Sequence, residues 1–251
     1  MPKTIGSRET KGEEGMKLKI MTYNVQHFQN YITNVIDFDE VAKVVKKYDP
    51  DVIAFNEVRG FANTDDYLEQ TDIMQEKLGY PYKYFAEAIR FKNRYPYGNA
   101  ILSKYPIEVE NIKIPDPEFK LNLKGYYETR CIIKAKVLAP TEFTVMASHF
   151  GLNADEHMNA VTTMIKNMPE EKCVVMGDFN MTPSHPIIPG LLQRLNDTVE
   201  KIEGSILSFP SDNPTIKIDY ILTSKDIICE YADIPAETAS DHRPYFAILE
   251  I

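Results

Sequence analysis

The chain contains no tryptophan, only three cysteines among its 251 residues, and no apolar run near the roughly 20 residues that a membrane-spanning helix needs. The cysteines, Cys131, Cys173 and Cys229, lie in apolar, strand-like stretches. Their spacing fits neither a zinc site nor a disulfide framework, so we expect buried structural thiols.

An apolar signal-peptide core is also missing from the polar first segment, "MPKTIGSRETKGEEG". We interpret residues 1–16 as a disordered leader, with Met16 as an alternative start, and expect a cytoplasmic protein.

Positive charge is in deficit, because 28 Lys and Arg face 37 Asp and Glu, which gives a net charge of −9. Duplex nucleic acid is bound largely through Lys and Arg, so this balance argues against a protein that wraps long polyanions without specificity.

Strands and helices alternate after Met16 with no linker, repeat or low-complexity tract, so residues 17–251 are expected to form one domain. Strands outnumber helices, and many neighbouring strands have no helix between them, which predicts mixed sheets. The pattern fits an α/β fold with two packed mixed β-sheets flanked by helices. Helices are expected over 38–49, 64–79 and 155–168, the second closed by Gly79.

Polar residues stand at the ends of four apolar strands: Asn24 in "IMTYN", Glu57 in "VIAFNE", His149 in "VMASH", and Asp178 with Asn180 in "VVMGDFN". Open α/β sheets bind ligands beyond the carboxyl ends of their strands. Any one of these residues alone would be read as a cap or turn, but several strands that end alike favour a shared site.

The C-terminal part adds Asp219 within the apolar strand "KIDYIL", and Asp241 with His242 in "ASDHRPY". A buried carboxylate needs a partner. Asn, Glu and Asp side chains supply the hard oxygen ligands that suit Mg²⁺ or Mn²⁺, and histidine can hydrogen-bond a phosphate or move a proton near neutral pH. These residue types together predict cleavage of phosphate esters.

The same stretches resemble the endonuclease/exonuclease/phosphatase superfamily. Eight of them occur in the family's order between Lys17 and Ile251: "TYN", "FNE", "YGNAILS", "ETR", "SHFGLN", "GDFN", "IDYI" and "SDHRP". The resemblance implies a four-layer α/β sandwich and a metal-dependent hydrolase in which water attacks phosphorus.

The resemblance also implies a role for each site residue. Glu57 would bind the metal with Asn24 and Asp241, while Asp178 would orient or deprotonate water and Asn180 would hold the phosphate or the base. His242 would contact the phosphate with Asp219 as its carboxylate, and His149 would stand near the leaving group, paired with Glu87 of "YFAEAIR". Arg130 of "ETR" would support the phosphate.

The sequence departs from the family at Asn56, where a glutamine is usual, and this puts the contact of that amide in doubt. Asn99 and His27 have no role that the pattern assigns. The segment with Arg90, Lys92 and Arg94 is expected to border the site. The substrate is predicted to be a small or single-stranded phosphoester, with a DNA endo- or exonuclease and a non-catalytic binding module as alternatives; the oligomeric state is not indicated.

Overall fold

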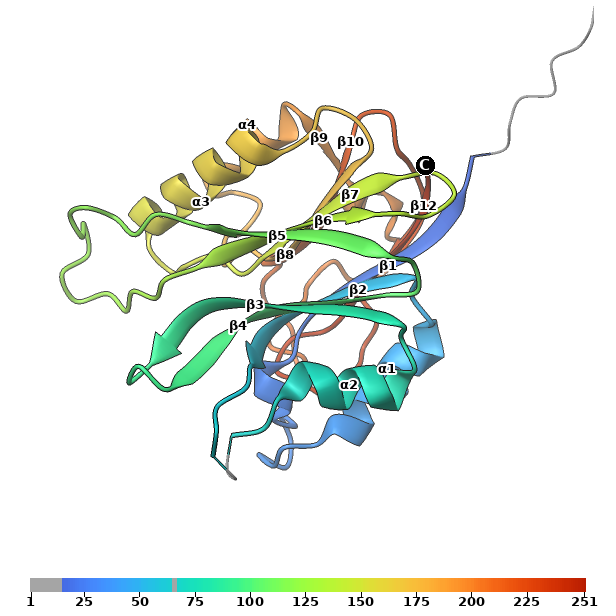
Figure 1. Ribbon diagram of the computed structural model, residues 1–251. Helices are drawn as coiled ribbons and strands as arrows, with labels where there is room; N and C mark the ends of the chain where they lie inside the picture. Colours follow the sequence, from blue (N-terminus) through green and yellow to red (C-terminus); the bar gives the residue numbers. More distant parts are fainter. Residues whose placement is uncertain (1–14, 65–66) are drawn as a thin grey trace, which may run out of the picture.

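The computed structural model describes residues 15–64 and 67–251, so residues 1–14 of the expected leader lie outside the described residues. Two six-stranded sheets form the body of the molecule (Figure 1). In spatial order the first sheet contains β11 (Ile228–Asp233), β12 (Tyr245–Glu250), β1 (Lys17–Asn24), β2 (Val52–Arg59), β4 (Tyr95–Ser103) and β3 (Tyr82–Phe91). The second contains β5 (Ile107–Lys113), β6 (Cys131–Val137), β7 (Phe143–Ser148), β8 (Cys173–Asp178), β10 (Asp219–Ser224) and β9 (Leu195–Asp197).

Both sheets are mixed, as predicted, because β1 pairs with β2 and β7 with β8 in parallel while the other pairings are antiparallel. Helices α1 (Phe38–Tyr48) and α2 (Gln70–Leu78) cover the first sheet, and α3 (Ala154–Asn167) and α4 (Ile188–Leu192) cover the second (Figure 1).

The two sheets and the two outer sets of helices form four layers, and apolar side chains fill the three spaces between them. The central layer packs alternate residues of the two sheets against each other, such as Leu18 of β1 and Val145 of β7. A second layer joins the first sheet to α1 and α2, and a third joins the other sheet to α3 and α4. The expected four-layer α/β sandwich is therefore confirmed.

Helix α1 begins where the sequence indicates. The Asp37 side chain accepts hydrogen bonds from the backbone N–H groups of Asp39 and Glu40, each at 3.1 Å. Its valines at positions 41, 44 and 45 are buried against the sheet. A side-chain N-cap and an apolar stripe thus agree on this element.

The second predicted helix was placed too early. Helix α2 starts at Gln70 instead of residue 64, although it ends at Gly79 with a left-handed φ of 74° as expected. The Tyr67 hydroxyl donates to the carbonyl of Pro96 (2.6 Å), and the Gln70 side chain accepts from the backbone of Arg59 (2.8 Å). These contacts hold the segment before α2 against β2 and β4, which competes with helix formation.

Candidate active site

Seven of the predicted site residues line one cavity of about 550 Å³: Glu57, Arg130, His149, Asp178, Asn180, Asp241 and His242. They come from both sheets, mostly from strand ends or the loops next to them. Asn24 and Asp219 are buried behind this cavity and contact its lining. The structure therefore brings together all the predicted residues except Glu87.

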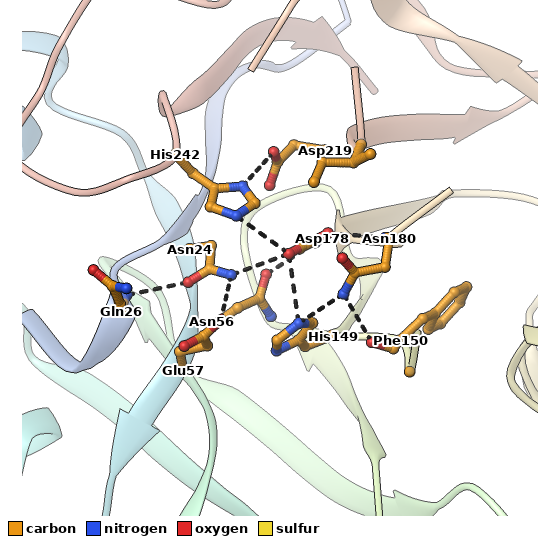
Figure 2. Close-up of polar contacts among 12 residues, drawn as sticks. Asn24, Gln26, Asn56, Glu57, His149, Phe150, Asp178, Asn180, Asp219 and His242 are labelled. Atoms are coloured by element: carbon orange, nitrogen blue, oxygen red, sulfur yellow. Dashed lines mark hydrogen bonds and ion pairs between the residues drawn. The ribbon is translucent and has the colours of Figure 1, made fainter. Parts of the chain in front are cut away.

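Asp178, the last residue of β8, is the centre of the cluster (Figure 2). Its Oδ1 accepts from the backbone N–H of Asn180 (2.8 Å), and its Oδ2 accepts from the Asn24 amide (3.0 Å). Burial raises the pKa of the Asp178 carboxyl to about 7, although the His242 ring beside it acts in the opposite direction. A carboxyl with this pKa can exchange a proton near neutral pH.

Gly177 allows β8 to end in this position. Its φ is +138°, and a Cβ atom there would lie 1.8 Å from the carbonyl oxygen of Ser148 on the neighbouring strand. No other residue type fits so close to that backbone. The glycine in "GDFN" is thus required by the approach of β7 to β8.

Asn56 fixes the backbone of Asp178 from the opposite sheet. Its Oδ1 accepts from the N–H of Asp178 (3.0 Å), and its Nδ2 donates to Oδ1 of Asn99 (2.8 Å). The side chain of Asn99 donates in turn to the carbonyl of Cys131 (3.4 Å). The shorter amide at residue 56 therefore reaches its partner, and Asn99 gains a role as its support.

His242, in the loop before β12, contacts carboxylates on both sides of its ring. Its Nδ1 lies 2.8 Å from Oδ2 of Asp219, and its Nε2 lies 3.6 Å from Oδ2 of Asp178. Burial alone would lower the pKa of His242, but the two carboxylates outweigh it and raise that pKa to about 10. The ring is a cation at neutral pH, and the expected pairing with Asp219 is present.

His149, directly after β7, has a cation as its neighbour. Its Nδ1 lies 3.0 Å from Nη1 of Arg130, and its Nε2 lies 3.5 Å from Oδ2 of Asp178. Burial, followed by the charge of Arg130, lowers the pKa of His149 well below its usual value, so the ring is neutral. Because arginine can only donate, Nδ1 accepts, and the proton of the neutral ring lies on Nε2.

The expected pairing of His149 with Glu87 is wrong. Both ring nitrogens have other partners, since Nδ1 accepts from Arg130 and the Nε2–H faces Oδ2 of Asp178. Glu87 stands at a β-bulge in the β3–β4 pairing, and its carboxylate instead forms a salt bridge with Arg90 on the same strand. A bulge changes the direction in which a side chain points, which the sequence pattern does not reveal.

Glu57 enters the cavity from a second bulge. It is the extra residue between Asn56 and Val58 in the β2–β4 pairing, with a left-handed φ of 62°. Its two oxygens accept from the Asn24 amide (2.9 Å) and from the Tyr97 hydroxyl (2.8 Å). Such strained backbone is typical of functional positions.

Asp241 lies in the same cavity as Glu57. Its pKa is raised above the ordinary value, mainly by burial and, against the opposing charge of His242, also by the Glu57 carboxylate. Two acids in one partly buried cavity repel each other, so this wall of the cavity favours a bound cation.

The walls of the cavity carry residues that we had not selected from the sequence. They are mostly aromatic, and they also include a cation and a further acid: Tyr67, Phe91, Tyr97, Tyr126, Phe209, Arg59 and Glu128. The guanidinium of Arg59 lies over the ring of Tyr67 (5.3 Å), and among the described residues no carboxylate pairs with it. His27 also lines the cavity. Arg59 directly follows "FNEV" on β2, which is the one signal that could have indicated it.

The basic segment borders the cavity only in part. Phe91, the last residue of β3, is a lining residue. Arg90 pairs with Glu87, and the guanidinium of Arg94 lies over the ring of Tyr95 (5.5 Å). These two cations are thus directed to their own hairpin.

Acidic and imidazole groups that could hold a metal are present at the centre of the site. Ligand atoms of Asp178, Asp219 and His242 all lie within 4.8 Å of one another, and all three residues are buried. Nδ1 of His242 and Oδ2 of Asp219 already contact each other at 2.8 Å. The adjacent oxygens of Glu57, Asp241 and Asn24 are the expected alternative set.

Comparison with known proteins gives a consistent assignment. The model described as "Endonuclease/Exonuclease/phosphatase family" matches residues 21–242. The chain is 24% identical to the uncharacterized protein YbhP of Escherichia coli strain K12, over 93% of this chain and 96% of that protein.

Solved structures share the fold. An endonuclease/exonuclease/phosphatase from Beutenbergia cavernae superposes with a TM-score of 0.77 at 19% identity, covering 94% of this chain and 72% of the other. The mannosyl-6-phosphatase Bt3783 of Bacteroides thetaiotaomicron superposes with a TM-score of 0.70 at 16% identity, covering 93% and 100%.

Proposed function

Because the chain belongs to the endonuclease/exonuclease/phosphatase family, we propose that it is a divalent-metal-dependent hydrolase of phosphate esters. The observation that carries this proposal is the position of Asp178, whose Oδ2 lies 3.5 Å from Nε2 of His149 and 3.6 Å from Nε2 of His242. A proton acceptor between two N–H donors suits a reaction in which water loses a proton while phosphoryl oxygens gain negative charge.

The residues present fit a divalent cation of the hard type. Glu57, Asp241 and Asn24 offer only oxygen ligands once the Asn24 amide turns its oxygen inward. In the structure the Asn24 N–H₂ group stands between Oε1 of Glu57 and Oδ2 of Asp178, where a positive partner is needed. When bound there, Mg²⁺ or Mn²⁺ supplies charge stabilisation to a phosphoryl oxygen.

The protein groups perform the remaining chemistry. Asp178, held by Asn24 and the backbone of Asn180, accepts a proton from the attacking water. The new P–O bond forms opposite the bond that breaks, so that no covalent intermediate with the protein arises. The Nε2–H of His242 donates to a phosphoryl oxygen, and that of His149 to the oxygen that leaves.

The substrate is proposed to be a small or single-stranded phosphoester. A cavity of about 550 Å³ lies within the range of small-molecule sites. Among the described lining residues the permanent cations are Arg59 and Arg130, and Arg130 already contacts Glu128 (3.0 Å) and His149. Two such cations can bind one or two phosphates but cannot follow a duplex.

A nuclease remains the second candidate, and the aromatic wall is the observation that favours it. Rings such as those of Tyr97 and Tyr126 can stack on bases of a single strand. A non-catalytic binding module is the third candidate, and it requires that the assembled Asp178 cluster be inactive.

A substrate panel tests the reaction itself. The metal-stripped protein is assayed with bis-p-nitrophenyl phosphate, p-nitrophenyl phosphate, sugar phosphates, single-stranded DNA and plasmid, before and after addition of Mg²⁺ or Mn²⁺. Sugar phosphates are included because the neighbour from Bacteroides thetaiotaomicron is described as a mannosyl-6-phosphatase. We expect turnover only with added metal. Absence of turnover on every substrate would favour the binding module.

Replacement of Glu57 tests the metal ligands. Glu57→Gln keeps the shape of the side chain and removes its charge, so we expect activity to fall by at least about 10²-fold. The matched control is Glu110→Gln on β5, whose side chain lies outside the cavity lining. Wild-type activity of Glu57→Gln across metal concentrations would contradict this ligand assignment.

Salt dependence separates the first two candidates. Hydrolysis of a small phosphodiester is expected to change little as salt is raised, because few charges contact the substrate. Efficient plasmid nicking that falls steeply with salt and is lost in Asp178→Asn would instead support the nuclease.

A further inference from the structure

The connection between β5 and β6, residues 114–130, stands out from the body of the molecule at the left of Figure 1. Every second residue in its middle part is a large apolar side chain in water. Phe119 is 77% exposed, Leu121 76% and Leu123 91%. Together with Tyr126 and Leu152, which are exposed at 59% and 55%, they form what we call the apolar loop surface.

This exposure does not come from a loosely attached loop. The backbone N–H of Leu121 donates to Oδ2 of Asp155 (2.9 Å), and the carbonyl of Tyr126 accepts from the Asn153 side chain (2.7 Å). The N–H of Glu128 donates to Oε1 of Glu156 (3.2 Å). The start of α3 therefore holds the connection at three places.

Polar side chains of the loop are exposed like their apolar neighbours, and two of them make contacts that support the loop. The Asn122 side chain donates to Oδ1 of Asn153 (3.0 Å), and the ammonium of Lys120 lies over the ring of Tyr127 (4.6 Å). Exposed apolar side chains on an anchored loop indicate a surface that is covered in use.

The apolar loop surface is continuous with the catalytic cavity, because Tyr126 and Leu152 also line that cavity. The connection that carries most of it projects from the body of the molecule (Figure 1). A standard protein–protein interface uses roughly 20–30 residues on each side, which is many more than this surface offers. A projecting apolar tip with an interfacial tyrosine is better suited to a soft lipid surface.

We propose that the apolar loop surface inserts into the surface of a lipid bilayer, so that the cavity receives the phosphoester head group of an amphiphilic substrate. The inference rests on the proposed function for the head group, but the insertion itself requires no turnover. The loop carries Lys120 and Lys124 together with Asp116 and Glu118, so its charges balance. Apolar insertion must then supply most of the affinity, and zwitterionic lipid is sufficient.

A single introduced tryptophan reports the insertion, because the chain has none of its own. In Leu123→Trp we expect the emission to move to shorter wavelength, and quenching by iodide to weaken, when phosphatidylcholine vesicles are added. The matched control is Ile228→Trp on the edge strand β11, where the native side chain is 59% exposed. Its emission should not respond to vesicles.

Flotation of the otherwise unchanged protein with the same vesicles measures the affinity. Leu123→Asp should weaken vesicle binding by about tenfold, from the loss of one buried leucine side chain. Ile228→Asp should leave it unchanged. Addition of anionic phosphatidylglycerol to the vesicles, or of salt to the buffer, should alter binding little.

Three outcomes would overturn the inference. One is an unchanged spectrum of Leu123→Trp together with no flotation. Another is a spectral shift that appears without lipid and rises with protein concentration alongside a dimer mass, which would assign the surface to a second copy of the chain. The third is equal loss of flotation in Leu123→Asp and Ile228→Asp.

The two proposals can fail separately. Asp178→Asn should bind vesicles like the wild type, since the carboxylate is buried and does not belong to the apolar loop surface. Vesicle binding without hydrolysis of any phosphoester would support insertion of the apolar loop surface and reject the proposed reaction. Hydrolysis without vesicle binding would support the proposed reaction and reject insertion into lipid.

Discussion

The two histidines of the candidate active site lie on two sides of the Asp178 carboxylate, but the groups behind them have opposite charge. Nδ1 of His242 is bound to the Asp219 carboxylate at 2.8 Å, whereas Nδ1 of His149 accepts from the Arg130 guanidinium at 3.0 Å. Asp178 raises the pKa of His242 further, and burial with Arg130 lowers the pKa of His149.

This difference shows how one residue type can supply two functions. A protonated His242 presents a cationic N–H to Asp178, and a neutral His149 presents an uncharged N–H whose tautomer is fixed by Arg130. In the proposed reaction the cation faces the charged phosphoryl group, while the neutral ring faces the leaving oxygen. Groups whose neighbours separate their pKa values in this way are typical of acid–base sites.

The largest loss of activity is expected from replacement of Asp178, the carboxylate that both histidines face. Asp178→Asn preserves the shape of the side chain, and its amide oxygen can still accept from the N–H of Asn180. It removes the proton acceptor, so kcat/KM should fall by about 10²- to 10⁴-fold. Thermal unfolding at a midpoint near that of the wild type is the control, and a loss of less than about tenfold would exclude Asp178 as the base.

Replacement of Asp219 tests the contribution of protonated His242 alone. Asp219→Asn keeps the size of the side chain but removes the charge that favours protonated His242. We expect kcat/KM to fall by about 10- to 10²-fold, as is found when the outer carboxylate of a metal-bound histidine is removed. The ¹⁵N signals of the His149 ring should stay as in the wild type. A change in those signals would mean that the two sides are not independent.

Replacement of Arg130 tests the contribution of the neutral His149 ring. Arg130→Gln removes the donor to Nδ1 of His149 and the salt bridge to Glu128. We expect a loss of about tenfold in kcat/KM, because the ring loses its fixed tautomer but keeps its position. Ring ¹⁵N spectra should show a single neutral tautomer, protonated on Nε2, in the wild type and a mixture of tautomers in the variant. An unchanged spectrum in the variant would remove the positioning role of Arg130.

The sequence was sufficient to predict most of the site because the site is built at strand ends. An apolar run fixes the strand, and the first polar residue after it marks the edge of the sheet. Asn24 and Asp178 both follow this rule, and both are found there. Two packed mixed sheets with outer helices were predicted from the excess of strands over helices, and the four-layer sandwich was implied by the family resemblance.

The contacts behind the site were not predictable, because they depend on register and on packing between the sheets. Glu57 and Glu87 both stand at bulges, yet one bulge directs its carboxylate into the cavity and the other leaves it beside Arg90. Asn56 contacts a backbone group 122 positions away in the opposite sheet. The residues that neighbour Asn56 in the sequence do not predict such a contact.

The smallest effect is expected for Glu87→Gln, because the Glu87 carboxylate pairs with Arg90 and not with His149. The Glu87 side chain is 35% exposed, and the exposed salt bridge with Arg90 that it would lose contributes only about 0–1 kcal/mol to stability. We therefore expect kcat/KM within about twofold of the wild type, in contrast to the loss in Arg130→Gln. If the two variants lose activity equally and their His149 ring spectra change alike, Glu87 must reach the ring in the working enzyme. Equal losses without that spectral change would instead place the effect of Glu87 in the β3–β4 hairpin, through Arg90 and the adjacent Phe91 on the cavity wall.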